Sequence, residues 1–229
     1  MYLEVKDIKK SYGKKQVLQR VSFSAGRGSC VGIIGANGSG KSTILRLLAG
    51  VEKADGGDIW IDGALVKNPE EQMAKYVGYI PQESVLIPEL TVADNLNLWT
   101  SLGDYQKNRE NCRKLVEQFK IDSFIRQKVK TLSGGMSKRV GIVCALLHEP
   151  SILLMDEPSA ALDLVCKEEL KSYIRAFVEK GGIVLLSSHD QGEIALCDAL
   201  WAVKDGNLFS VPAGMSLEQI VAKYVYQRV

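Results

Sequence analysis

The most informative segment of this chain is a glycine-rich run, Gly35-Ala36-Asn37-Gly38-Ser39-Gly40-Lys41-Ser42-Thr43. It fits the pattern G-x-x-x-x-G-K-[ST], and it lies between the apolar run CVGII and the helical pattern KSTILRLLA. The glycines let the backbone wrap around a polyphosphate, with amides directed inward at the positive end of a helix. The stretch therefore predicts a nucleoside triphosphate site in which Lys41 contacts the β- and γ-phosphates and Ser42 binds Mg²⁺.

A second motif, ILLMDE at residues 152–157, complements this phosphate loop. Four apolar residues predict a buried parallel strand, which would deliver two acids to the sheet edge where ligands of such sheets collect. By itself the motif fits a strand followed by a solvated acidic turn. Beside the phosphate loop, we interpret Asp156 as holding Mg²⁺ through water and Glu157 as orienting or deprotonating the attacking water.

Around these motifs, strand and helix patterns alternate, which predicts one α/β domain with a mostly parallel sheet. Predicted strands are Tyr2–Ile8, Val17–Ser24, Ser29–Ile34, Gly57–Ile61, Tyr76–Ile80, Ile152–Met155, Gly182–Ser187 and Leu200–Val203. Predicted helices are Lys41–Ala49, Thr91–Leu102, Gln106–Phe119, Ser133–Leu147, Leu164–Val178, Gln191–Leu196 and Leu217–Val225. The first strands have an antiparallel pattern, and residues 83–149 are mainly helical.

The composition argues against several classes of protein. The 229 residues carry a net charge of +2, which argues against nucleic-acid binding by charge alone. The longest stretch without a charged side chain, 28–40, is far shorter than the ~20 residues that a membrane span needs. The opening MYLEVKDIKK shows no signal peptide, and five widely spaced cysteines without a CxxC pair indicate reduced thiols in the cytosol.

Between the two phosphate-site motifs stands Leu132-Ser133-Gly134-Gly135-Met136. With it, nearly the whole chain resembles the nucleotide-binding subunit of an ATP-binding cassette (ABC) transporter. Ser133 is a good N-cap and the two glycines leave the backbone open, so the motif predicts a second helix start suited to an anion. In the family, this signature is offered to ATP on the other subunit, so that two ATP molecules lie between two cassettes.

Other positions follow the family's order. The resemblance implies that Tyr12 stacks on adenine, that Gln82 is the Q-loop glutamine at the metal site, that Ser159–Asp163 is the D-loop and that His189 senses the γ-phosphate. It implies a P-loop NTPase fold of the ABC type, with a mixed sheet core, an N-terminal antiparallel β-subdomain and an inserted helical subdomain. The core would comprise residues 1–82 and 150–229, and the helical subdomain residues 83–149.

The chain departs from the family at Met136, where glutamine is usual, so any polar contact of that side chain is lost. SGGM followed by Ser137, Lys138 and Arg139 resembles cassettes of small ABC-2 exporters. Only residues 190–229 follow His189, too few for the regulatory β-domain of maltose-type import cassettes. A separate integral membrane partner is implied, with this subunit on the cytoplasmic face of the membrane.

We therefore expect an ATPase that drives transport, closing with a second copy or a close paralogue on two Mg·ATP. Two alternatives remain open: a non-transport cassette, for example in iron–sulphur assembly, and a cassette that binds ATP without turnover. For docking on a membrane subunit, several of Val85, Leu86, Ile87 and Leu90 should be exposed. We interpret His148, at a helix end, as a favourable charge.

Overall fold

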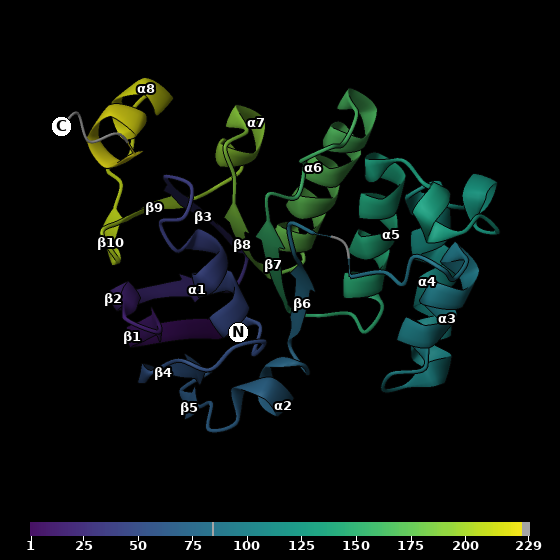
Figure 1. The fold of residues 1–229 in the computed structure, drawn as a ribbon, viewed down its shortest axis with the longest axis horizontal. Helices are drawn as coiled ribbons and strands as arrows, with labels where there is room; N and C mark the ends of the chain where they lie inside the picture. Colours follow the sequence, from purple (N-terminus) through teal and green to yellow (C-terminus); the bar gives the residue numbers. More distant parts are fainter. Residues whose placement is uncertain (84, 226–229) are drawn as a thin grey trace.

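The computed structural model describes residues 1–83 and 85–225, and ten strands of this part form one mixed sheet (Figure 1). Its strand order is β5-β4-β1-β2-β10-β9-β3-β8-β7-β6. The strands are β1 (Tyr2–Tyr12), β2 (Lys15–Gly26), β3 (Ser29–Gly35), β4 (Gly56–Ile61), β5 (Ala64–Leu65), β6 (Val77–Ile80), β7 (Ile152–Asp156), β8 (Ile183–Ser187), β9 (Ala199–Lys204) and β10 (Asn207–Ser210). The predicted mixed α/β fold is confirmed.

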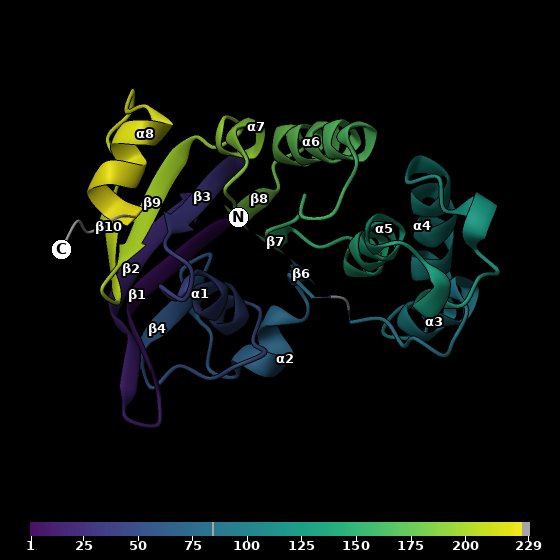
Figure 2. The same ribbon diagram turned by 45° about the horizontal axis from the view of Figure 1, so that its top comes forward.

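Helices cover the sheet. At one end the fold continues beyond the sheet into α3, α4 and α5, the helical layer, which lies to the right in Figure 2. The α-helices are α1 (Lys41–Leu48), α2 (Pro69–Met73), α3 (Val92–Thr100), α4 (Tyr105–Gln118), α5 (Gly134–Leu146), α6 (Leu164–Glu179), α7 (Gln191–Ile194) and α8 (Leu217–Ile220). Short 3-10 turns lie at η1 (Asp122–Phe124) and η2 (Val129–Thr131), and a π-helical segment, η3 (Val221–Val225), follows α8. None of the helices in the described residues is long and apolar enough to cross a membrane.

The strands β3, β8, β7 and β6 are neighbours and run parallel. Ile33 on β3 pairs with Ser187 on β8, which in turn pairs with Asp156 on β7. On the other side of β7, Met155 pairs with Ile80 of β6. The carboxyl ends of all four strands therefore meet at one edge, where the chain continues into the phosphate loop and into the residues after 156, 187 and 80.

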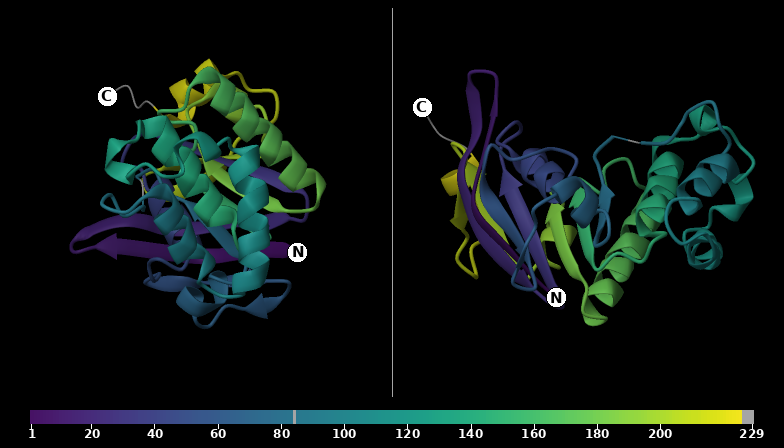
Figure 3. Two further views of the ribbon diagram at one scale, coloured as in Figure 1. Left: turned by 90° about the vertical axis from the view of Figure 1, so that its right-hand side faces the viewer. Right: turned by 90° about the horizontal axis from the view of Figure 1, so that it is seen from below.

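Alternation along these strands sends side chains into two cores, since successive residues of a strand face opposite sides. Ile152 and Leu154 of β7 pack with buried residues of α1, and Leu153 and Met155 pack with those of α5 and α6. At the N-terminus, β1 pairs antiparallel with both β2 and β4, and the β1–β2 hairpin extends beyond the rest of the sheet (Figure 3).

The helix α5 runs antiparallel to β6 and lies directly on it. Near the start of β6, a Cβ on Gly78 would lie 2.4 Å from the Ala145 carbonyl oxygen. Just past the end of β6, Lys138 Nζ donates to the Pro81 carbonyl at 2.8 Å. The N-terminal end of α5, with Ser133 as its cap, therefore points to the side of the sheet where the parallel strands end.

All strands and helices predicted from sequence are present, with ends shifted by a few residues. The short elements β5, α2, η1, η2 and β10 were not predicted from sequence. The expected exposed patch is confirmed for Val85 and Ile87, which are 50% and 40% exposed. Leu90 is half-buried, and Leu86 is buried because its side chain joins the core of the helical layer.

Candidate active site

The phosphate loop, residues 35–40, links β3 to α1 and needs glycine at its end. Gly40, the N-cap of α1, has φ +112°, and a Cβ there would lie 2.8 Å from a methyl group of Leu18. Ser39 Oγ is buried and has no hydrogen-bond partner among the described residues. The loop borders a hollow of about 470 Å³. An orphaned hydroxyl beside open backbone amides is what an incoming phosphate would satisfy.

Lys41, the first residue of α1, is 7% exposed, and its ammonium lies within the phosphate loop. Nζ donates to the carbonyl oxygens of Gly35 at 2.9 Å and Ala36 at 3.2 Å. Burial lowers the pKa of Lys41, while the negative charges of Glu157 and Asp156 act in the opposite direction. The cation is thus held at the site by loop carbonyls, which it can exchange for phosphate oxygens.

Asp156 and Glu157 lie at the end of β7, as predicted. Ser187 Oγ on β8 donates to Asp156 Oδ1 at 2.5 Å, which fixes this buried carboxylate. Glu157 has φ +48°, and its backbone N–H donates to the Ser187 carbonyl at 3.1 Å. This turn directs the Glu157 side chain toward His189, with 3.2 Å between Oε1 and Nε2. The two predicted reaction residues therefore contact each other across β7 and β8.

The donor set suits Mg²⁺, which prefers oxygen ligands and keeps several waters. Ser42 supplies a hydroxyl at the start of α1, and Asp156 supplies a carboxylate at the end of β7. No group of three or more His, Cys, Asp and Glu side chains within residues 1–83 and 85–225 could hold a metal alone. A site with few protein ligands fits a cation that shares its remaining positions with phosphate and water.

Gln82 follows β6, beside the end of β7, and its side chain is exposed. Its backbone is held by Lys138 of α5, whose buried ammonium donates to Pro81 O at 2.8 Å and to Gln82 O at 3.4 Å. Burial lowers the pKa of Lys138, opposed by the negative charge of Asp156. Gln82, the last residue before the helical segment 83–149, is thus tied through its carbonyl to α5, the helix that begins at the signature.

Tyr12 lies at the end of β1, and the residue is 43% exposed. The phenol donates to Glu52, which also pairs with Arg46 of α1 at 2.6 Å between Nε and Oε1. Lys10 Nζ lies 5.3 Å from the ring centroid. The ring is therefore fixed at its polar tip and one face, while part of its surface is open to solvent, as expected of a platform for a base.

The signature residues line a separate hollow of about 630 Å³ with Ala161 and Asp163 of the D-loop. Ser133 caps α5 by accepting a hydrogen bond from Met136 N at 3.2 Å. The Met136 side chain packs against the helical core. None of the phosphate-loop residues lines this hollow, and none of the signature residues lines the one beside the phosphate loop. One chain therefore brings Lys41, Asp156, Glu157 and His189 to a single edge, but it leaves Ser133, Gly134 and Gly135 in a second site.

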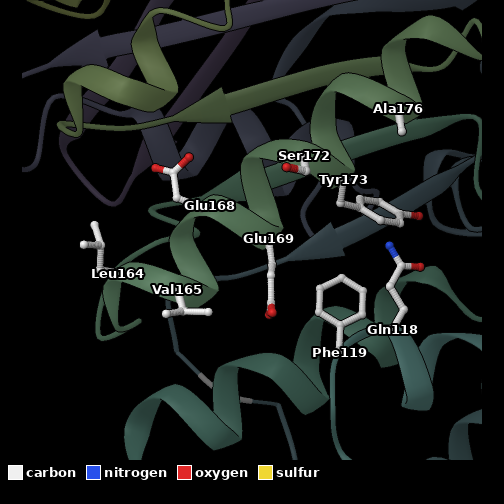
Figure 4. A pocket seen from close by; sticks show the side chains of 9 residues that line it. All are labelled: Gln118, Phe119, Leu164, Val165, Glu168, Glu169, Ser172, Tyr173 and Ala176. Atoms are coloured by element: carbon white, nitrogen blue, oxygen red, sulfur yellow. The ribbon is translucent and has the colours of Figure 1, made fainter.

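A third hollow, of about 620 Å³, lies between α6 and the end of α4 (Figure 4). Phe119, Glu169 and Tyr173 lie around it. It contains none of the residues predicted to bind nucleotide or metal, so it forms no part of the candidate site.

The interpretation of His148 as a helix-terminal charge is wrong. Its Nε2 lies 3.1 Å from the Val77 carbonyl, so the ring donates there, and burial lowers its pKa. A neutral ring bonded to β6 follows from the close approach of α5 to this strand.

Three residues of the site escaped the sequence analysis. Ser187 fixes Asp156, Lys138 holds the Q-loop backbone and Glu52 holds the Tyr12 phenol. Two features of the sequence could have identified them: Ser187 ends a predicted strand, and Lys138 lies in the basic run after the signature. Nothing in the local sequence marks Glu52, because its partners lie on other elements.

Residues 18–160 match the family model described as ABC transporter. The linearmycin resistance ATP-binding protein LnrL of Bacillus subtilis (strain 168) is 31% identical over 212 residues, which cover 91% of this chain and 68% of LnrL. The lipoprotein-releasing system ATP-binding protein LolD of Porphyromonas gingivalis (strain ATCC BAA-308 / W83) is 33% identical over 218 residues, covering 92% of this chain and 100% of LolD.

Solved structures of ATP-binding cassettes share the fold of this chain. An ATP-binding subunit of an ABC transporter superposes with a TM-score of 0.82 at 30% identity, covering 96% of this chain and 92% of its own. A dimeric ATP-binding cassette in a post-hydrolysis state with ADP and phosphate superposes with a TM-score of 0.80 at 26% identity, covering 92% and 99%.

Proposed function

This chain belongs to the ABC transporter family, as an ATP-binding subunit with ATPase activity, and we propose that Glu157, His189, Lys41 and Gln82 carry out its hydrolysis step. The proposal rests on the edge where four parallel strands end, since it brings a buried cation, two acids and a histidine together. The same edge offers the backbone amides of residues 35–43 to the phosphates.

In this mechanism the phosphate loop binds the triphosphate and Lys41 neutralises its β- and γ-oxygens. Glu157 accepts a proton from the attacking water, and His189, 3.2 Å from its carboxylate, orients it and contacts the γ-phosphate. Tyr12 presents its open ring to adenine, which is typically worth about 1–3 kcal/mol per stacked base. Gln82 would relay the nucleotide state to the helical layer, because its backbone carbonyl accepts a hydrogen bond from Lys138 of α5.

Mg²⁺ fits the oxygen donors at this edge. Ser42, Asp156 and Gln82 would hold it, and it would supply charge neutralisation on the transferring phosphate. Ser187 keeps the Asp156 carboxylate in place for this task.

We further propose that ATP is bound between two cassettes, so that Ser133, Gly134 and Gly135 complete the site of the other subunit. One observation supports this proposal: in a single chain the phosphate loop and the signature line different hollows. A relative of known structure is dimeric with ADP and phosphate. The second cassette is another copy of this chain or a close paralogue.

The membrane partner is a proposal as well. Val85 and Ile87 are exposed directly after the Q-loop, and they suit an apolar contact with a separate membrane subunit. This contact would place the cassette on the cytoplasmic face of the membrane, and it would act on residues 83–149, the proposed helical subdomain. The proposed core then comprises residues 1–82 and 150–229.

A mixing experiment tests the shared site. Lys41→Ala disables the phosphate loop and Ser133→Glu places an acid at the signature, so each variant alone should hydrolyse ATP very slowly. In a mixed dimer, one site combines the intact Lys41 of one chain with the intact Ser133 of the other, and phosphate release should recover. Mixing Lys41→Ala with Lys41→Met is the control and should recover nothing. Absence of recovery in the first mixture, with both variants folded, would refute the shared site.

A further inference from the structure

The segment after His189 contains a buried acid that the mechanism above does not use. Glu193 is 1% exposed and lies on α7, whose N-cap Asp190 directly follows His189. Carboxylates are seldom fully buried unless other groups hold them, because burial removes their hydration. What holds Glu193 is therefore informative.

One partner of Glu193 is the residue before His189. Ser188, 1% exposed, donates its hydroxyl proton to Glu193 Oε2. The same Ser188 oxygen accepts a hydrogen bond from Asp190 N at 2.9 Å. The backbone on both sides of His189 is thus fixed to one carboxylate through one hydroxyl.

The other neighbour of Glu193 belongs to the D-loop. Ser159 is 6% exposed; burial raises the pKa of Glu193, and the nearby Ser159 hydroxyl acts in the opposite direction. Glu193 Oε1 has no hydrogen-bond partner among the described residues, which leaves this oxygen available to the Ser159 hydroxyl. Ser159 lies two residues after Glu157, and the turn between them is closed by Ala160 N, which donates to Glu157 O at 3.1 Å.

We propose that Glu193 is a positioning residue that sets the distance between Glu157 and His189. It would act through Ser188, which precedes His189 and donates to its carboxylate, with Ser159, two residues after Glu157, as the second buried hydroxyl near that carboxylate. The inference rests on the proposed roles of Glu157 and His189 and adds the group that keeps their segments in register. The 3.2 Å contact between Glu157 and His189 joins the ends of β7 and β8, and the hydrogen bond from Ser188 to Glu193 holds the segment of His189.

Substitutions of similar volume test this role. Glu193→Met fills the space but leaves the Ser188 hydroxyl without its acceptor, and it should lower kcat at least about tenfold, the order of effect expected when a proton acceptor is misplaced. KM for ATP should stay within about twofold, because the phosphate loop is untouched. Glu193→Gln should restore most of kcat, since its amide can accept from Ser188 and donate to Ser159.

A matched control separates positioning from folding. Asn108 is 2% exposed and donates to the Leu102 carbonyl at 2.6 Å in the helical layer, away from the catalytic edge. Asn108→Leu should lower Tm and leave kcat unchanged. In a background of Ser159→Ala and Ser188→Ala, Glu193→Met should cost little more, because the groups through which it acts are gone.

A spectroscopic readout does not depend on turnover. The chain has two histidines, so ring ¹⁵N resonances report His189 with His148 as internal reference. Glu193→Met should move only the His189 signals, in the same direction as Glu157→Gln does. Unchanged His189 signals, or a Glu193→Gln protein no more active than Glu193→Met, would overturn the proposal. If Glu157→Gln itself turns over normally, the roles proposed for Glu157 and His189 are wrong. The His189 resonances then still test whether Glu193 positions His189.

Discussion

Glu157→Gln is the sharpest test of the assigned water-activating acid. The substitution removes the proton acceptor but keeps the size of the side chain and an oxygen that can face His189 Nε2, now 3.2 Å away. The backbone of residue 157 stays held by Ser187, through N–H bonds of 3.1 Å to its carbonyl and 3.2 Å to its hydroxyl. The loss should therefore be confined to proton transfer.

Removing a general base typically costs about 10²–10⁴-fold in rate, or roughly 3–5 kcal/mol at 1.36 kcal/mol per factor of ten. Phosphate release by the purified protein measures this loss, and titration with a fluorescent ATP analogue should give unchanged affinity. With Mg·ATP the variant should accumulate as a dimer in size-exclusion chromatography.

The matched control is Glu149→Gln, just before β7. This acid is paired with Lys107 at 2.8 Å and lies at the end of β7 opposite to Asp156, so its loss should leave turnover and affinity unchanged. Near-normal phosphate release by Glu157→Gln would refute the reasoning, as would an equal loss in both variants.

Three further outcomes are expected. Tyr12→Ala should weaken ATP binding about tenfold or more while Tyr12→Phe retains most of the affinity, because stacking needs only the ring; fluorescent nucleotide titration measures both. Burial lowers the pKa of His148, so stability should fall as pH drops below its ordinary value of about 6.5, and His148→Gln should flatten this dependence in urea unfolding at several pH values. Leu170→Ala should cost about 2–5 kcal/mol of unfolding free energy, because Leu170 is 1% exposed in the core, whereas Leu164→Ala, at a position 75% exposed, should cost almost nothing in the same assay.

The candidate site was predictable where its residues form contiguous motifs. Residues 35–43 and 152–157 carry strand, loop and chemistry in one string, so their place at the strand ends followed from sequence, and the structure puts them there. The site roles themselves remain predictions, as do the signature's part in a second subunit and the likeness to ABC-2 exporters.

What the sequence could not show depends on contacts between distant elements. Leu86 has the same local character as Val85 and Ile87, and only the packing of the helical layer decides that it alone is buried. Glu193 is one acid among several after His189 until the fold places Ser159 and Ser188 around it. Short elements such as β10 were missed because their four residues carry too little periodicity to distinguish them from a turn.

The close packing of α5 on β6 has a mechanical consequence. The backbones approach closely at Gly78 and Ala145, near the C-terminal end of the helix, which leaves little room for movement at this point. From there to Gly134 the helix measures about 17 Å at 1.5 Å per residue, and a tilt of about 10° would swing its far end by about 3 Å. The Lys138 ammonium donates to the Pro81 carbonyl at 2.8 Å between these two points, and this hydrogen bond opposes such a tilt.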